Sequence, residues 1–180
     1  MAKAQTACIG LGSNLGPSLQ LLLSAWRQLG QHPAIETVRI SSPYRSQPQG
    51  VETEHWFVNA VGLIRTTLAA DTLLAHLHLI EEQHGRRREP GQTAYRDRTL
   101  DLDLLLYGDL LTHEPALTVP HPRMLERRFV LAPLAEIAPD LVHPLAGKTV
   151  VALLGILEKT DLNQCVEKTG WLPARCGWRS

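Results

Sequence analysis

The spacing of hydrophobic residues changes along the chain between a strand-like and a helix-like pattern, and these changes predict its secondary structure. Strand-like runs cover residues 6–11, 35–44, 57–67 and 99–107. Two helices are predicted between them, from apolar residues at helical spacing over 19–29 and 73–80. The order β-α-β-β-α-β predicts an α+β fold of the ferredoxin-like type, in which an antiparallel sheet carries both helices on one face.

The helix ends and the later part of the chain complete this prediction. Pro17 suits the first position of the first helix, and Asp71 suits the N-cap of the second. Two C-terminal helices are expected near 127–137 and 149–159. The chain is therefore interpreted as a single domain over 1–180. Its core is expected over about 5–158, and the extension 159–180 has no predicted role.

The composition excludes several classes of protein. Eighteen Lys and Arg balance eighteen Asp and Glu, so no overall positive field favours a nucleic acid or an acidic membrane. No apolar run approaches the ~20 residues of a membrane span, and the N-terminus lacks the apolar stretch of a signal peptide. Three scattered cysteines do not make a disulfide framework. We expect a cytoplasmic monomer with no nucleic-acid or membrane partner.

Two aspartates interrupt the leucine-rich fourth strand. Residues two apart in a strand point to the same face, so Asp101 and Asp103 share one face while Leu100, Leu102 and Leu104 share the other. A lone D-x-D is more often a solvated surface, but aspartate is unfavourable in strands, and a reason is needed for two of them here. Paired carboxylates that hold two Mg²⁺ ions would be such a reason.

Arginines are concentrated just before this pair. Five lie within thirteen residues: Arg86, Arg87, Arg88, Arg96 and Arg98. A run of charge is often only a solvated surface. Beside two carboxylates, however, arginines form a dipolar site that suits a metal–polyphosphate ligand, because its anionic oxygens accept bidentate hydrogen bonds.

Other phosphate and metal motifs fail on spacing. The glycines of Gly10-Leu-Gly-Ser-Asn-Leu-Gly do not fit G-x-G-x-x-G, and Gly147-Lys-Thr lacks the first glycine of a P-loop. No two histidines have a metal-binding spacing, whereas His121, close to Arg123 and Arg127, can contribute to a phosphate site. Any nucleotide chemistry must therefore use the arginines and the aspartates.

The same residues carry a resemblance to a known family over about residues 6–158. The matching stretches are Ile9-Gly-Leu-Gly-Ser-Asn-Leu-Gly, Ser41-Ser-Pro-Tyr-Arg-Ser, Phe57-Val-Asn-Ala, Gly85-Arg-Arg-Arg, Arg98-Thr-Leu-Asp-Leu-Asp-Leu-Leu-Leu-Tyr-Gly, Val119-Pro-His-Pro-Arg-Met and Arg127-Arg-Phe. The Arg-Thr-Leu-Asp-x-Asp core is specific, and more so together with Gly-Ser-Asn and Val-Pro-His. The chain thus resembles the 6-hydroxymethyl-7,8-dihydropterin pyrophosphokinase family of folate biosynthesis.

The resemblance implies transfer of the β,γ-diphosphate of ATP, the co-substrate, to the hydroxymethyl oxygen of the pterin, with release of AMP. It implies that Asp101 and Asp103 hold two Mg²⁺ ions and act in catalysis with Arg86 and Arg98. The implied pterin contacts are Ser46, Gln47, Gln49, Phe57, Asn59 and Phe129, and the implied ATP contacts are Glu81, Arg88, Arg96, Thr118, His121 and Arg127. No strong general base is evident; Asp103 is the nearest candidate.

Several positions depart from the family pattern, among them Glu89, which stands where a basic residue can occur, and two other functions stay open. Tyr95 stands where the family often has Trp, and Pro122 where an aromatic residue follows the histidine, which affects the adenine side of the site. An RNA-binding module of ferredoxin-like fold would need aromatic residues on an open sheet face, but only 5% of this chain is aromatic. A regulatory nucleotide binder without catalysis is the second alternative.

Overall fold

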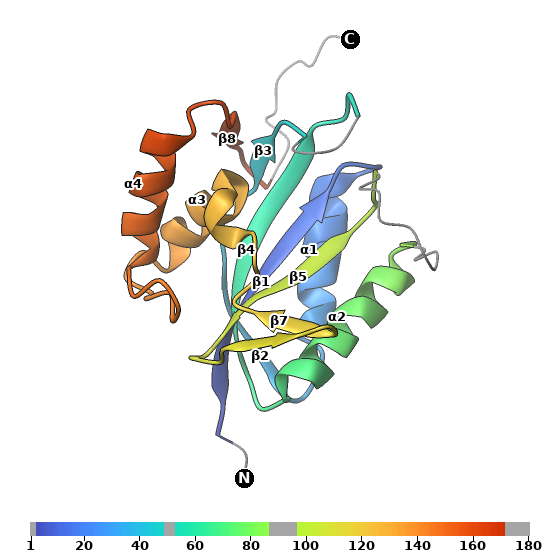
Figure 1. The fold of residues 1–180 in the computed structure, drawn as a ribbon. Helices are drawn as coiled ribbons and strands as arrows, with labels where there is room; N and C mark the ends of the chain where they lie inside the picture. Colours follow the sequence, from blue (N-terminus) through green and yellow to red (C-terminus); the bar gives the residue numbers. More distant parts are fainter. Residues whose placement is uncertain (1–2, 49–52, 87–96, 172–180) are drawn as a thin grey trace.

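The computed structural model describes residues 3–48, 53–86 and 97–171 (Figure 1). Its first half contains β1 (Gln5–Ser13), α1 (Ser18–Leu29), β2 (Ile35–Ile40), β3 (Tyr44–Ser46), β4 (Phe57–Thr66) and α2 (Ala70–Gln83). The second half contains β5 (Asp101–Tyr107), β6 (Thr112–Glu114), β7 (Leu117–Val119), the 3₁₀ helix η1 (Met124–Glu126), α3 (Arg128–Ile137), α4 (Val150–Thr160) and β8 (Val166–Lys168). In these described ranges, no helix is long and apolar enough to cross a membrane.

One antiparallel sheet organises the molecule. Its strands follow the order β5-β1-β4-β3-β8, and β2 pairs with the remaining part of β4. The predicted α+β fold, an antiparallel sheet with both early helices on one face, is confirmed (Figure 1). The prediction of one strand over 35–44 is wrong, because β2 and β3 are separate strands. Pro43, which has no N–H to donate to a ladder, lies between them.

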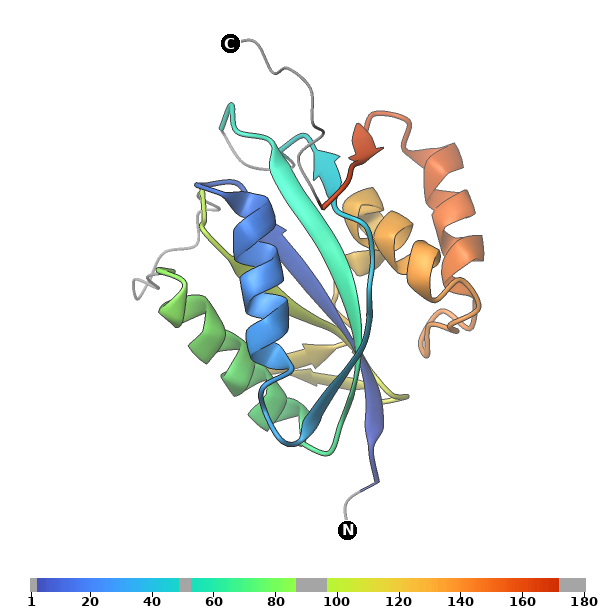
Figure 2. The same ribbon diagram turned by 180° about the vertical axis from the view of Figure 1, so that it is seen from behind.

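The two faces of the sheet are covered differently. α1 and α2 lie together on one face, and α3 and α4 lie on the opposite side (Figures 1 and 2). The face under α1 and α2 is a continuous apolar core that includes Ile9, Leu22, Leu73, Leu77 and Leu102. A second apolar cluster, which includes Val61, Leu105, Leu131 and Leu134, joins α3 and α4 to the other face. This second face also carries the polar residues described below.

Close packing explains one glycine of the central strand. A Cβ atom at Gly62 in β4 would lie 2.2 Å from the ring of Trp26 in α1. Since real Cβ contacts are never so short, α1 can approach the sheet only because residue 62 has no side chain.

Both predicted helix starts need correction. The N-cap of α2 is Ala69 rather than Asp71, because the helix begins at Ala70, which is buried against the core. Asp71 lies instead in the first turn, where its carboxylate accepts the N–H of Thr72 and suits the positive end of the helix dipole. Pro17 is the N-cap of α1, one position before the first helical residue.

Part of the extension for which the sequence predicted no role belongs to the sheet. β8 pairs with β3, so that Tyr44 faces Lys168 and Ser46 faces Val166. Beyond β8, the indole N–H of Trp171 donates to the carbonyl of Ser41 at 3.1 Å. The chain from Gln164 to Trp171 therefore contacts the edge of the sheet that lies beside α3 (Figure 1).

Candidate functional site

β5 places its two aspartates on the face that looks toward α3. Their neighbours across the strand pair are glycines of β1, since Asp101 pairs with Gly12 and Asp103 pairs with Gly10. A Cβ at Gly10 would lie only 3.6 Å from the Cβ of Asp103 and 3.4 Å from Leu105. Glycine therefore leaves open space beside the carboxylates, where a side chain on β1 would fill it.

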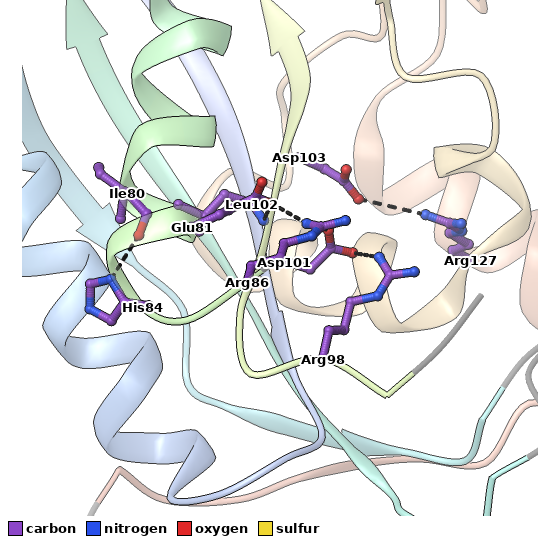
Figure 3. Close-up of polar contacts among 9 residues, drawn as sticks. All are labelled: Ile80, Glu81, His84, Arg86, Arg98, Asp101, Leu102, Asp103 and Arg127. Carbon is purple, nitrogen blue, oxygen red and sulfur yellow. Dashed lines mark hydrogen bonds and ion pairs between the residues drawn. The ribbon is translucent and has the colours of Figure 1, made fainter. Parts of the chain in front are cut away.

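Asp101 lies between two arginines (Figure 3). Arg86 and Arg98 each donate to a different oxygen of its carboxylate. Arg86 also donates to Glu81, which is fully buried and accepts the N–H of Leu102 at 2.7 Å. Burial acts to raise the pKa of Asp101, but the charges of Arg98 and Arg86 outweigh it and lower the pKa. Asp101 is thus held as a carboxylate.

Asp103 has much weaker charge compensation. Its carboxylate lies 3.8 Å from the guanidinium of Arg127, which approaches from the side opposite to Arg86 (Figure 3). Burial and then the nearby charge of Asp101 raise the pKa of Asp103. Two carboxylates with opposite pKa shifts therefore lie side by side. The charged form of the second carboxylate is therefore less well compensated than that of the first.

Asn14 fixes the approach of Arg98 to this pair. Its side-chain oxygen accepts the N–H of Arg98 at 2.7 Å, and its own N–H donates to the Arg98 carbonyl at 3.1 Å. Its amide nitrogen donates to Asp97 at 2.6 Å. The turn after β1 thereby holds the main chain that leads into β5.

A cavity opens next to the aspartates, between β1, β4 and the start of α3. Its volume is about 700 Å³ with its open mouth included, and its lining combines Ser46, Gln47, Phe57, Asn59, Arg98, Asp101, Asp103, Arg127 and Phe129 with apolar residues. Asn59 is buried and donates to the hydroxyl of Ser46 at 2.9 Å. Its oxygen lies close to Gly12, where a Cβ would come within 3.2 Å of it. The walls thus offer aromatic rings and a few fixed polar groups, as small-molecule sites do.

The predicted nucleotide residues are only partly brought together. His121 lies beside β5, because its N–H donates to the carbonyl of Leu105, but it does not line the cavity. Burial, and then the charges of Arg127 and Arg123, lower the pKa of His121 to about 4. Its Nδ1 accepts the N–H of Arg123 at 3.2 Å, which leaves Nε2–H of the neutral ring as a donor. Thr118 is on β7, where its hydroxyl donates to Glu114, and it does not line the cavity.

Three predicted residues lie outside the described part of the chain: Gln49, Arg88 and Arg96. Sequence reasoning also missed residues that the structure brings to the site. Gly10, Gly12 and Asn14 belong to the Gly-Leu-Gly-Ser-Asn run, which failed as a dinucleotide motif. The signal was present as two glycines at alternate positions of one strand. The two glycines leave open space beside the strand that carries the aspartates. This can be recognised only once the register of β1 with β5 is known.

Comparisons with known proteins show the family of the chain. A model of the family described as 7,8-dihydro-6-hydroxymethylpterin-pyrophosphokinase (HPPK) matches residues 8–139. A relative from Synechocystis named 2-amino-4-hydroxy-6-hydroxymethyldihydropteridine pyrophosphokinase is 44% identical over 148 residues, which cover 82% of this chain and 74% of the relative. A relative of the same name from Haemophilus influenzae is 43% identical over 139 residues, 77% of this chain and 85% of the relative.

A solved structure shares the fold. The chain superposes on a crystal structure of Plasmodium falciparum HPPK-DHPS with a TM-score of 0.69 and 14% sequence identity, over 87% of this chain. The match spans only 46% of that longer chain.

Proposed function

The chain belongs to the HPPK family, and from that membership we propose that it transfers the β,γ-diphosphate of ATP to 6-hydroxymethyl-7,8-dihydropterin and releases AMP. The observation that best supports this reaction is the position of Asp101 and Asp103. The two carboxylates line a cavity that also contains Phe129 and Asn59, and they lie among three arginines. The carboxylate pair therefore lies between the arginines, which can bind anions, and the part of the cavity with Phe129 and Asn59, which can bind a ring.

The carboxylate pair fits Mg²⁺. Mg²⁺ takes oxygen ligands, and in phosphate-transfer sites it is held by one or two carboxylates together with substrate phosphates. The raised pKa of Asp103 reflects burial and then repulsion from Asp101, and a divalent cation between the two would relieve that repulsion. Among the described residues, no three His, Cys, Asp or Glu side chains form a metal-binding group. We therefore propose that Asp101 and Asp103 would hold two Mg²⁺ ions together with phosphate oxygens of the substrate and water.

The reaction needs little covalent participation by the protein. The hydroxymethyl oxygen attacks the β-phosphorus and loses its proton, and the bond from that phosphorus to the α,β-bridging oxygen breaks, so that AMP leaves with the electron pair. Bound Mg²⁺ would neutralise phosphate charge and lower the pKa of the attacking hydroxyl. Arg86 and Arg98 then stabilise charge on the transferred group and on AMP. Asp103 is the nearest candidate to accept the proton.

The cavity supplies the pterin contacts. Phe129 stacks on the ring, and Phe57 contacts it from β4. The buried amide of Asn59 bonds the polar edge of the pterin, and its orientation is set by its hydrogen bond to Ser46. The main chain of Gln47 completes the wall, and Gln49 is proposed to extend it. A pocket whose amide is already held in place recognises the ring with little loss of side-chain entropy.

The arginine side of the site takes the nucleotide. Glu81 is proposed to seat ATP through the Arg86 side chain that it holds. His121, as a neutral Nε2–H donor, and Arg127 are proposed to bind the triphosphate, with Thr118, Arg88 and Arg96 as further contacts. In this arrangement the positive groups surround the phosphates, while the pterin occupies the aromatic part of the cavity.

We further propose that residues 1–180 act as one catalytic domain, as a monomer in the cytoplasm. Gel filtration with light scattering tests the monomer directly, and a mass near the 20.0 kDa of the chain is the expected result.

The function is tested by AMP formation from ATP and Mg²⁺ with and without the hydroxymethyl pterin. We expect AMP only when the pterin is present, together with an equal amount of pterin diphosphate. The same pterin without its hydroxyl group serves as the control and should give no AMP. Folded protein that releases no pterin-dependent AMP would refute the proposed reaction.

A further inference from the structure

Gln164 is a buried glutamine in the C-terminal segment, by which we mean residues 161–171. Only 7% of it is exposed, and its amide is fully hydrogen-bonded. Its oxygen accepts the N–H of Arg128 at 2.7 Å, and its nitrogen donates to the carbonyl of Glu126 and to the carboxylate of Asp161, both at 2.8 Å. A buried amide with three such bonds holds its partners in one arrangement.

Two of these bonds hold the main chain on either side of Arg127, a residue of the site. Glu126 and Arg128 flank Arg127, and Arg128 is the first residue of α3. The N-cap of α3 is Arg127, whose side chain makes no capping bond, so Gln164 supplies an acceptor for this helix end from a distant part of the chain. Arg127 and Phe129 both line the cavity, and the Arg127 guanidinium lies 5.5 Å from the centre of the Phe129 ring. Gln164 therefore fixes the main chain of one cavity wall.

The same segment also holds a second part of the cavity lining, at β3. The N–H of Gln47 donates to the carbonyl of Cys165 at 3.3 Å, and the N–H of Thr169 donates to Pro43 at 2.8 Å. These bonds flank β3, which carries Ser46 and leads to Gln47, two residues of the cavity lining.

A carboxylate of α3 connects these two parts of the cavity lining. Glu136 accepts hydrogen bonds from Ser42 at 2.8 Å and from Tyr44 at 2.8 Å, and the amine of Lys168 in β8 lies 3.4 Å from it. The start of α3 and the β3 edge are therefore joined by the C-terminal segment at one end and by Glu136 further along α3. Neither Gln164 nor β8 lies in the residues 8–139 that the family model matches.

We propose that the C-terminal segment positions the pterin pocket, and that Gln164 is its principal positioning residue. Gln164 does not line the cavity; it acts through Phe129 and Arg127. The identity of the ligand rests on the proposed function, whereas the positioning of α3 by Gln164 does not. Without Gln164, the N–H of Arg128 and the carbonyl of Glu126 lose their partner, and the start of α3 can move away from the ring-binding geometry.

The test uses the full chain with Gln164→Ala, and with Leu162→Ser as a matched control. Leu162 is two residues away and 85% exposed. We expect the KM for the pterin to rise about tenfold in Gln164→Ala and to stay unchanged in the control. A purely structural role would lower the amount of active enzyme while leaving the KM unchanged, and that result would overturn the proposal.

A double-mutant cycle with Phe129→Ala identifies the route of the effect. If Gln164 acts through Phe129, then adding Gln164→Ala to Phe129→Ala raises the KM by much less than tenfold. Fully additive effects would contradict this route. If Gln164→Ala does not fold, Asp161→Ala serves instead, because it removes the hydrogen bond from the Gln164 amide nitrogen to the Asp161 carboxylate. An unchanged KM in that variant would equally overturn the proposal.

A readout without substrate separates this inference from the proposed function. Amide hydrogen exchange at Arg128, Val130 and Leu131, whose N–H groups are hydrogen-bonded at the start of α3, should be about tenfold faster in Gln164→Ala than in the wild type or in Leu162→Ser. Unchanged exchange would refute the positioning role even if the wild type proved to be an active pyrophosphokinase. Wild-type protein without pterin-dependent activity, but with faster exchange in Gln164→Ala, would refute the proposed function alone.

Discussion

The two faces of β5 differ in chemistry: one is packed in the apolar core, and the other carries the polar residues of the site. On the face toward α1 and α2, Leu100, Leu102 and Leu104 are buried in a continuous apolar core. On the other face, Asp101 and Asp103 stand beside a cavity and among arginines. Because side chains alternate along a strand, each aspartate is held in place by the leucines that precede and follow it. The apolar face gives stability and rigidity, and the polar face receives a fixed carboxylate pair.

The aspartates also differ from each other. Asp101 is held between Arg86 and Arg98, which keep its pKa low, so its charge is compensated within the chain. The carboxylate of Asp103 lies 3.8 Å from the guanidinium of Arg127, and its pKa is raised. A carboxylate that gains so little from the fold is best explained by a role that requires its charge. The comparison therefore predicts that stability and activity depend on different faces of β5.

The largest effect is expected on activity, from Asp103→Asn. If the carboxylate holds Mg²⁺, turnover should fall about a thousandfold. The side chain is 38% exposed and its raised pKa means that the ionised form weakens the fold, so the free energy of unfolding at pH 8 should be equal to or slightly above that of the wild type. Steady-state kinetics and chemical denaturation measure the two quantities. Normal turnover would contradict the metal role.

Leu104→Ala should reverse this pattern. Truncation of a leucine that is 4% exposed leaves a cavity in the core and should lower the free energy of unfolding by about 3 kcal/mol. Turnover per folded molecule should change less than about threefold, since the aspartates lie on the opposite face of β5 from the core that contains Leu104. Leu111→Ala, at a leucine that is 54% exposed, is the control and should cost under about 0.5 kcal/mol. A thousandfold loss of turnover in Leu104→Ala would show that the faces are not separable.

Glu81→Gln tests the group that connects the two faces. Its buried carboxylate accepts the N–H of Leu102 and pairs with Arg86, and the amide keeps the first bond but loses the charge pair. We expect a loss of about 2 kcal/mol in the free energy of unfolding and a fall in turnover of about tenfold, as Arg86 loses one of its partners. Denaturation and kinetics on the same samples check both. A change in only one of the two quantities would argue against a connecting role.

The smallest effect concerns His121. Its folded pKa of about 4 lies below the ordinary value of 6.5, so the unfolded state binds the proton more readily and stability is lost as pH falls from about 6.5 to 4. His121→Gln removes this loss. When the pH is lowered from 7 to 5, the free energy of unfolding of the variant should rise by about 1 kcal/mol relative to that of the wild type. This figure is reduced for partial exposure of the ring.

Much of the fold could be predicted because periodicity follows burial closely. The alternation in β5 predicted which side chains share a face, and helical spacing predicted α1 to α4 within a few residues. The helix starts were less predictable. Asp71 has the chemistry of an N-cap, but the helix begins at Ala70 because packing against the core decides its first turn.

The site was predictable where chemistry is visible in residue type, as for Asp101 and Arg98. It was not predictable where function depends on register or on distant contacts. Gly10 and Gly12 matter because they lie opposite the aspartates, and Gln164 matters because it reaches the start of α3 across 36 residues of sequence. No local pattern marks such residues.

The most direct test of the central claim is the fate of the three phosphates of ATP, followed by phosphorus NMR with the pterin and Mg²⁺. The account predicts that the β- and γ-phosphates appear together as a coupled pair on the pterin while the α-phosphate appears as AMP, and that Asp103→Asn abolishes both signals with its fold intact. Formation of ADP or inorganic phosphate in place of AMP, or an unchanged spectrum with Asp103→Asn, would contradict it.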